Sequence, residues 1–506
     1  MSEAFLLILW LIPLLPACAG LLVPALPARH GALGSTAAAF GALALALAAT
    51  AWRWPWMEVT TVTGPGLLVL RWDLPAAVMV LLVTFIGMVV MRFSRRYLDG
   101  DPGQGRFYGW LNLTLASVLL VMLSGHLLLL WAAWVATSLC LHQLLLFYPG
   151  RPAARFAARK KFVISRIGDV ALLAAAGLLY RDYGTLELTA LYAQVAASDG
   201  QGLGLVTGLL ALCAMCKSAQ LPFHTWLPDT MDTPTPVSAF MHAGIINAGG
   251  FLLIRVMPLL VQVPVVMNGL ALIGALTAGL GAVVMLTQPS IKRALAYSTV
   301  AQMGFMILQC GLGAPGLALI HIVAHSIYKA HAFLNAGSTV GAAPRAVIPL
   351  RQSAIVYGSA GSALLVAGGM TALHVTQGSV AAPFALISGF AAAYGLIRFG
   401  SLTAGWRGWG QGLLVALGVV GLSLLLHAGA ERLIPATNYV PSGLVLIAIT
   451  TLFAGLFLFQ LMLWRAGENP LARRVYVHAL NGFYLGTLAN RALGRLWPSN
   501  PPTVQS

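Results

Sequence analysis

Apolar stretches of membrane length recur along almost the whole chain. Each holds about 20 residues, enough for a helix to cross a hydrocarbon core of roughly 30 Å. Only 8% of the 506 residues are charged and 59% are hydrophobic, whereas about a quarter of a soluble globular protein is charged. A backbone in lipid must satisfy its own polar groups, which a helix does within one segment. The sequence therefore predicts an all-α polytopic membrane protein with about 13–15 transmembrane helices. The expected spans are 4–27, 33–51, 74–92, 108–124, 127–148, 161–180, 203–221, 237–257, 265–287, 294–312, 316–341, 353–374, 381–399, 410–428 and 442–464.

The basic residues support this list of spans. The net charge is +16, which by itself would also suit a nucleic-acid partner. Clusters of arginines and lysines, however, follow the first, third, fifth, ninth, eleventh and thirteenth spans, so these clusters fall on one side, as the positive-inside rule requires. We therefore expect the lipid bilayer and no nucleic acid as surroundings, with the N-terminus outside and the C-terminus cytoplasmic. The basic loop expected after the fifth span comprises Arg151, Arg155, Arg159, Lys160 and Lys161.

Three regions are expected along the chain. Residues 1–464 form the transmembrane bundle. Residues 465–498 form an amphipathic segment on the cytoplasmic side, because within 470–497 arginines alternate with large apolar residues. This segment either anchors the chain to lipid or docks a cytoplasmic partner. Residues 499–506 are expected to form a disordered tail.

The stretch 211–255 combines a buried base with an interrupted helix. Its apolar run carries Lys217 and then meets Pro222. A lysine at membrane depth is costly and marks a functional site by default. A helix broken in the bilayer is tolerated only where protein or water meets its freed backbone groups. The stretch therefore predicts an ion path and a discontinuous helix near Pro222. His242, in the next span, either links Lys217 to later lysines or is a packing residue.

A second group of ionisable residues lies in HIVAHSIYKAH, residues 321–331. His321, His325 and Lys329 are four residues apart, so they share one helix face with a rise of about 6 Å per step. Such a row suits a proton relay, although interhelical hydrogen bonds are the alternative. His331 lies off this face and is expected to be structural.

Lys217 needs a counter-charge, and Asp169 in the segment RIGDV is the best candidate. Arg166 lies one turn before Asp169 on the same helix face, so these two form either a structural pair or a charge switch that involves Lys217. Lys292 begins the tenth span, where it is either part of the path or a topology anchor.

Five cysteines lie in apolar runs, and one isolated C-x-x-C is not enough to predict a metal or redox site. We expect no cofactor and no metal in this chain.

Three strings make the chain resemble a known family. KSAQLPFHTWLPDTMDTPTPVSAFMHA (217–243), IKRALAYSTVAQMGFM (291–306) and HIVAHSIYKA (321–330) are similar to the antiporter-type subunits of respiratory complex I and of multisubunit cation/proton antiporters. The resemblance implies inverted repeats, broken helices and a membrane-embedded proton path. It assigns to this path Lys217, Asp169, His242, Lys292, His321, His325 and Lys329. The family usually carries a glutamate where this chain has Val135, and its terminal lysine or glutamate has no evident match after residue 350, where His374 offers an ionisable group near a span.

A narrower resemblance rests on MHAGIINAGGFLLIR (241–255) and VYVHALNGFYLGTL (475–488). These strings resemble DabB, the bacterial inner-membrane subunit of an inorganic carbon transporter. The resemblance implies a cytoplasmic partner of the DabA type, a zinc protein similar to carbonic anhydrase. It also implies that a flow of protons or Na⁺ through the membrane subunit drives hydration of CO2 to bicarbonate in that partner. The alternatives are a proton-pumping subunit of a complex I-like or Mrp-type complex, and a passive membrane anchor for a soluble enzyme.

Overall fold

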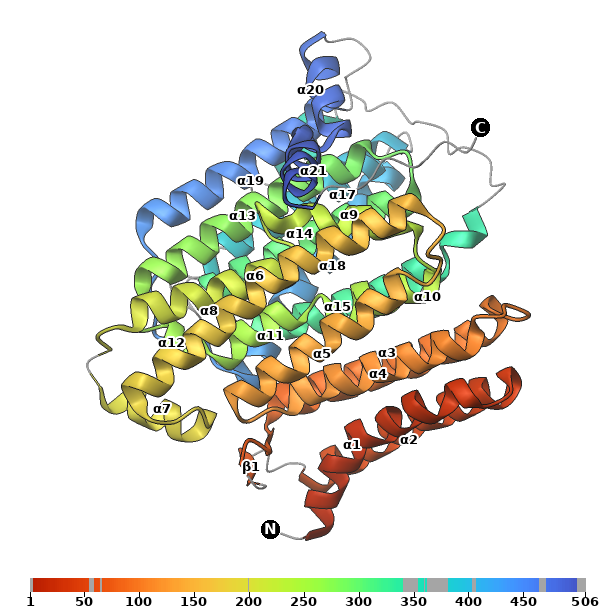
Figure 1. Ribbon diagram of the computed structural model, residues 1–506. Helices are drawn as coiled ribbons and strands as arrows, with labels where there is room; N and C mark the ends of the chain where they lie inside the picture. Colours follow the sequence, from red (N-terminus) through yellow and green to blue (C-terminus); the bar gives the residue numbers. More distant parts are fainter. Residues whose placement is uncertain are drawn as a thin grey trace.

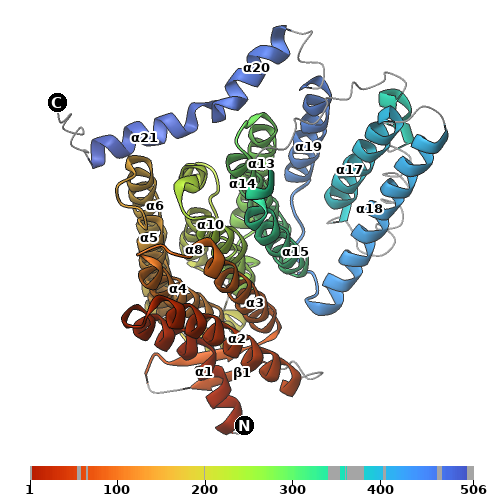
Figure 2. The same cartoon turned by 90° about the vertical axis from the view of Figure 1, so that its right-hand side faces the viewer.

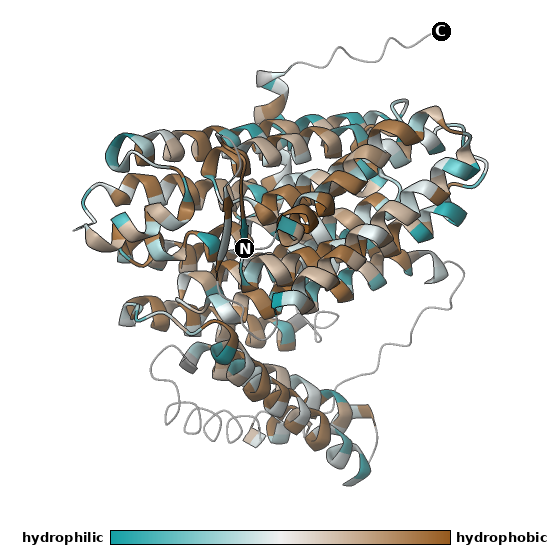
Figure 3. Cartoon of the chain, turned by 90° about the horizontal axis from the view of Figure 1, so that it is seen from below, coloured by the Kyte–Doolittle hydropathy of each residue, from teal (hydrophilic) through white to brown (hydrophobic). Residues whose placement is uncertain are grey.

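Long helices follow the apolar stretches of the sequence almost one for one (Figure 1). Among the residues that the structure describes, twelve helices are long and apolar enough to cross a membrane. Hydrophobic residues dominate them along most of their length (Figure 3). The broken helix that begins with α8 and the 21-residue helix α14 also belong to the bundle. The prediction of an all-α polytopic membrane protein is confirmed. The computed structural model describes residues 3–53, 59–63, 66–198, 200–339, 354–358, 360–361, 381–402, 406–463 and 470–497.

The described elements follow in chain order. In the first half they are α1 (Glu3–Leu22), η1 (Val23–Ala25), α2 (Ala28–Arg53), β1 (Thr60–Thr63), β2 (Val69–Trp72), α3 (Leu74–Tyr97), α4 (Gln104–Leu123), α5 (Leu127–Leu145), α6 (Pro152–Tyr183), α7 (Leu188–Ala197) and α8 (Leu203–Lys217). The central elements are η2 (Phe223–Thr225), α9 (Trp226–Asp229), η3 (Thr230–Asp232), α10 (Thr235–Phe240), η4 (Met241–Ile245), α11 (Ala248–Arg255) and α12 (Met257–Leu260). The remaining elements are α13 (Pro264–Thr287), α14 (Ile291–Gly311), α15 (Pro315–Leu334), η5 (Ala336–Thr339), α17 (Ala381–Leu402), α18 (Trp406–Leu433), α19 (Gly443–Leu463), α20 (Pro470–Leu480), η6 (Gly482–Tyr484) and α21 (Leu485–Leu496).

The bundle has two chemically different ends. One end carries the antiparallel β1–β2 hairpin and α7, and we call it the hairpin end. The other carries the end of α3 and the starts of α6 and α14, where arginines gather, and we call it the basic end. The predicted span 353–374 lies mostly outside the described residues, as do His374 and the tail 499–506. The inverted repeats and the orientation of the two ends in the membrane stay predictions.

The start of α6 differs from the prediction. The sequence predicted a span from residue 161 and a basic loop before it, but the helix begins at Pro152. Proline suits the first position of a helix because its missing N–H needs no partner there. Ala154, Ala157 and Ala158 then supply a buried face with helical spacing. The prediction that Lys160 and Lys161 lie in a loop is therefore wrong, because both are buried within α6.

The helix break is real but lies earlier than Pro222. Helix α8 ends at Lys217, and Ala219 takes a left-handed conformation with φ of 50°. The following span is also irregular, because five residues that include His242 form the π-helical turn η4 between α10 and α11. Turns of this kind are frequent at functional sites. Both irregular segments lie in the interior of the bundle, where most of their residues are buried.

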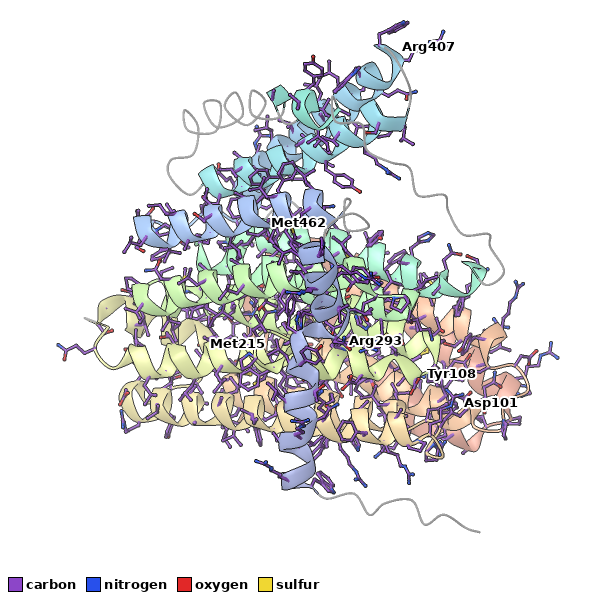
Figure 4. The ribbon with its side chains drawn as sticks, turned by 90° about the horizontal axis from the view of Figure 1, so that it is seen from above. Asp101, Tyr108, Met215, Arg293, Arg407 and Met462 are labelled. Atoms are coloured by element: carbon purple, nitrogen blue, oxygen red, sulfur yellow. The ribbon has the colours of Figure 1, made fainter. Side chains whose placement is uncertain are left out.

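The segment 470–497 forms the helices α20 and α21 and crosses the basic end of the bundle (Figure 2). A kink at η6, where Phe483 has a positive φ of 51°, separates α20 from α21. Seen from above, the two helices lie across the bundle beside Arg293 (Figure 4). The side chain of Gln288 donates to Leu480 O at 3.0 Å, and Lys160 donates to Asn490 Oδ1 at 2.7 Å. The segment is therefore held by the bundle itself.

Helices α13 and α14 approach each other through small residues. A Cβ on Gly304 of α14 would lie 2.7 Å from the carbonyl oxygen of Gly274 on α13, and the converse contact is equally short. In a bilayer, close backbone packing of this kind replaces the hydrophobic drive that associates helices in water.

We expect Gly304→Ala to lower the free energy of unfolding by about 1–3 kcal/mol, because the added methyl group forces the two backbones apart. Thermal unfolding of the purified protein in detergent measures the effect. The matched control is Gly269→Ala on α13, where an added Cβ meets nothing within 4 Å. Equal stability of the two variants would contradict the close-packing account.

A buried ion-pair cluster holds the hairpin end together. Asp73 caps the N-terminus of α3 by accepting from Ala76 N at 3.0 Å, and it pairs with Arg71 of β2 at 2.7 Å and with Arg255 at the end of α11. Arg71 also donates to Thr189 of α7 at 2.9 Å. One carboxylate therefore joins the hairpin, α3 and α11.

We expect Asp73→Asn to destabilise the chain by about 3–5 kcal/mol, because it leaves two guanidinium groups near each other without a counter-charge. Chemical or thermal unfolding in detergent tests this. Asp182→Asn, which removes the exposed partner of Arg181, serves as the control and should leave the free energy of unfolding nearly unchanged, because solvent screens an exposed ion pair.

The same cluster predicts a loss of stability in acid. Burial raises the pKa of Asp73, but Arg255 and Arg71 outweigh burial and hold that pKa below its ordinary value. A carboxyl with a depressed pKa stabilises the fold fully above its unfolded pKa of about 4, and this contribution is lost as pH falls through the folded pKa.

Candidate functional site

Lys217 stands at the point where α8 stops. As the last residue of that helix it lies beside carbonyl groups that have no helical partner, and their partial negative charge favours a cation. Its Nζ pairs with Asp169 Oδ1 of α6 at 2.5 Å, and both side chains are buried. The structure thus brings together the base and the acid that the sequence singled out.

Asp169 is shared between two cations. Its second oxygen lies 2.6 Å from the guanidinium of Arg166, one turn earlier on α6. The indole N–H of Trp131 donates to the backbone carbonyl of Asp169 at 3.0 Å, and the ring of Trp134 lies 5.4 Å from Lys217 Nζ. A carboxylate flanked by two cations is therefore fixed between α5, α6 and α8.

Lys161 extends this cluster, although the sequence analysis assigned it to a loop. Its Nζ donates to both the carbonyl and the hydroxyl oxygen of Ser138 on α5, each at 2.8 Å. Its side chain is buried, and the charges of Lys217, Arg166 and Asp169 act on it. In the described part of the chain Lys161 has no carboxylate partner. The helical spacing of Ala154, Ala157 and Ala158 is the sequence pattern that indicates a helix through Lys161.

His242 lies in the π-turn η4 and faces α14 and α15. Its Nδ1 lies 3.0 Å from the hydroxyl of Thr299, and its ring stacks on Phe333 with centroids 4.3 Å apart. Thr299 in turn donates to Leu295 O at 3.1 Å, and Lys329 Nζ donates to the same carbonyl at 3.1 Å. His242 and Lys329 are therefore anchored to one backbone carbonyl of α14.

The row on α15 is directed into the bundle. Lys329 and His325 are buried, and the His325 and His321 rings lie 6.3 Å apart. His321 contacts the side-chain oxygens of Gln302 and Gln309 on α14, each at 2.9 Å. The Nε2 atoms of His242 and His325 are buried and have no hydrogen-bond partner among the described residues.

Two lysines of the site region lie apart from this row. Lys292 is half-buried in the first turn of α14, at the basic end. Lys160 pairs with Asp229 of the short helix α9 at 2.8 Å and also binds Asn490 of α21. It therefore ties the broken-helix elbow to the C-terminal helix.

A further histidine was missed by the sequence analysis. His427 of α18 lines a small cavity of about 90 Å³ together with Phe384 and Glu431. Aromatic contacts connect it to the row: His321 to Phe305 at 5.4 Å, Phe305 to Phe384 at 6.2 Å, and Phe384 to His427 at 5.4 Å between ring centroids. A single histidine in one apolar span gives no signal of such a contact from sequence.

Metal ligands do not cluster in the described residues: no group of three or more histidine, cysteine or acidic side chains there could hold an ion. Cys213 and Cys216 are buried as free thiols in α8. The expectation that this chain carries no cofactor stays a prediction.

Comparisons with known proteins match most of this chain to one family of membrane subunits. Residues 124–348 match the family described as NADH:quinone oxidoreductase/Mrp antiporter, TM, and residues 56–108 match the complex I chain 5 N-terminus. A protein named probable inorganic carbon transporter subunit DabB2, from Halothiobacillus neapolitanus, is 38% identical over 86% of this chain and 82% of its own length. Its counterpart DabB from Hydrogenovibrio crunogenus is 39% identical over 84% of this chain and 83% of its own length. NADH-ubiquinone oxidoreductase chain 5 of Metridium senile is 38% identical, but over 54% of this chain and 46% of its own length.

A solved structure has the same fold. The Mrp complex from Dietzia sp. DQ12-45-1b contains a chain that superposes with a TM-score of 0.60 and 26% identity. The match covers 97% of this chain and 55% of that one. The chain belongs to the DabB family, within the antiporter-like membrane subunits of complex I and Mrp complexes.

Proposed function

We propose that this chain conducts protons across a bacterial inner membrane and thereby energises the uptake of inorganic carbon. The observation that carries the proposal is the buried Lys217–Asp169 pair at the end of a broken helix. In the proposed path, the ionisable side chains on η4 and α15 follow this pair. In order they are His242, Lys329, His325 and His321.

The chemistry of this row favours protons over Na⁺. Its members are amines and imidazoles, which gain and lose protons. Sodium sites in transporters use carbonyl and carboxylate oxygens, and the carboxylate at Lys217 is already engaged by two cations. The carbonyl of Leu295 accepts hydrogen bonds from Thr299 and Lys329 and has no proton to donate. It therefore anchors Lys329 directly and His242 through Thr299, and it does not conduct protons between them. Proton transfer then runs between the Nε2 atoms of His242 and His325 and the amine of Lys329, with water as the intermediary.

Lys161 is a second proton site at the Lys217 end of this path. Lys161, Arg166 and Lys217 bring three potential positive charges around one carboxylate, and an uncompensated buried charge is strongly unfavourable. Arg166 stays charged in proteins. Lys161 binds two neutral oxygens, so it is the member best placed to be neutral and to accept a proton.

The partner in this proposal is a cytoplasmic DabA-type zinc protein that hydrates CO2 to bicarbonate. The names of the two DabB relatives support inorganic carbon as the cargo, because both relatives match over more than four fifths of their length. The α20–α21 segment across the basic end offers a surface for such a partner. In this proposal the basic end faces the cytoplasm, so the C-terminus is cytoplasmic and the N-terminus lies outside.

We expect Lys217→Ala and Lys329→Ala each to reduce proton flux more than 10-fold, because each removes a titratable group from a single-file row. The measurement uses the full chain in liposomes with an internal pH dye and a potassium diffusion potential. Bicarbonate accumulation in cells that co-express the partner gives a second readout. Arg181→Ala, at the exposed end of α6, is the control. Unchanged flux in both lysine variants would overturn the proposal.

We expect Lys161→Met and Lys161→Arg to lose flux to a similar extent, roughly 10-fold or more, because arginine keeps the charge but does not release its proton. Ser138→Ala, which removes one of the two oxygens that hold the amine, should shift the pH dependence of flux with a smaller loss. Melting temperatures in detergent show whether each variant is folded. Full flux in Lys161→Arg would show that only the charge of Lys161 matters.

A further inference from the structure

An arginine-lined cavity opens at the basic end, away from the ion path. Arg29 of α2 and Arg92, Arg95 and Arg96 of α3 line it, and its volume is about 1350 Å³. All four arginines are exposed, and none of them forms an ion pair within the described part of the chain. The cavity is larger than the roughly 300–1,000 Å³ of ordinary small-molecule pockets.

The charge of the cavity suits an anion. Asp99 and Asp101 also line it, so four positive and two negative side chains leave a net charge of +2. Asp101 accepts hydrogen bonds from the Tyr148 hydroxyl at 2.9 Å and from Gly103 N at 2.7 Å, which engages both of its oxygens. The guanidinium groups therefore remain available, and their planar forks match phosphate oxygens.

A largely apolar groove, whose lining also includes His331 and Asn335, continues directly from this cavity. It has a volume of about 420 Å³ and lies between α3 and α15. Val89, Phe93 and Leu334 line both the cavity and the groove, so the two are contiguous. From Phe93 the groove follows α3 to Phe85, a distance of about 12 Å along a helix axis. It is therefore directed from the interface into the hydrocarbon.

We propose that this composite site binds one anionic phospholipid, with the phosphate headgroup among the four arginines and an acyl chain in the groove between α3 and α15. Basic residues at helix ends serve membrane topology in general. A continuous headgroup cavity and chain-sized groove goes beyond that requirement, and basic pockets between transmembrane helices are known receptors for anionic headgroups. The lipid would join the α1–α2 pair and α3 to α15, the helix that carries the His321–Lys329 row.

The test uses the full-length protein in neutral detergent and native mass spectrometry. Titration with phosphatidylglycerol should give one saturable adduct, whereas phosphatidylcholine should bind at least about 10-fold more weakly. Inorganic phosphate at the same concentration should neither bind nor compete. Competition by inorganic phosphate would mean a simple anion site, and equal binding of both lipids would mean a nonspecific groove. Either result overturns the proposal.

Two variants separate the headgroup from the chain. Replacement of Arg92, Arg95 and Arg96 by glutamine should weaken phosphatidylglycerol binding about 10-fold or more. Ala330→Phe, which fills the groove without changing charge, should weaken it as well. The matched control replaces Arg155, Arg159 and Arg293 by glutamine, with the same change of charge elsewhere on the basic end. An equal loss in this control, or full binding in both test variants at unchanged melting temperature, overturns the site.

Discussion

The ion pair between Lys217 and Asp169 is the interaction on which the rest of the interior depends. Two opposite charges at membrane depth are tolerated only when they are close together and screened from lipid. Helix α5 covers the pair with Trp131 and Trp134, and α6 supplies the acid. Gly168 eases the approach of α8, since a Cβ there would lie 3.1 Å from Cys216 Cβ and 3.3 Å from Lys217 Cε, which is closer than ordinary van der Waals contact. The packing of α5, α6 and α8 is therefore organised around a polar contact.

The same pair lies at the end of an interrupted helix, and the interruption exposes backbone groups that lipid cannot satisfy. The chain meets this requirement with local partners. Gln220 N donates to Met215 O at 2.9 Å, Leu221 N donates to Thr277 Oγ1 at 3.1 Å, and the Ser218 hydroxyl donates to Ile246 O at 2.6 Å. The last bond joins the end of α8 to the π-turn region. Two backbone irregularities, one at Lys217 and one at His242, thus lie against each other.

The sequence predicts the spans well because apolar length is a direct consequence of bilayer thickness. It also predicts Asp169 as the partner of Lys217, since carboxylates are rare at that depth. It misplaces Lys160 and Lys161 because a run of arginines and lysines has the composition of a loop, and only the pattern of Ala154, Ala157 and Ala158 indicates a helix. The π-turn at His242 and the contact of His427 with Phe384 depend on tertiary packing, which no local pattern reports.

In the proposed path, the second cation on Asp169 would let a proton leave Lys217 without isolating a buried charge. Val135 of α5 offers no carboxylate, and Asp169 of α6 is the carboxylate in contact with Lys217. Without Arg166, a neutral Lys217 would leave the Asp169 carboxylate unpaired in a medium of low dielectric, at a cost of several kcal/mol. Arg166, which does not release its proton, stays 2.6 Å from the second oxygen and keeps the carboxylate paired in both protonation states of Lys217. The proposal therefore gives the two cations different roles. The Arg166–Asp169 pair keeps the charge balance of the site, and Lys217 carries the proton.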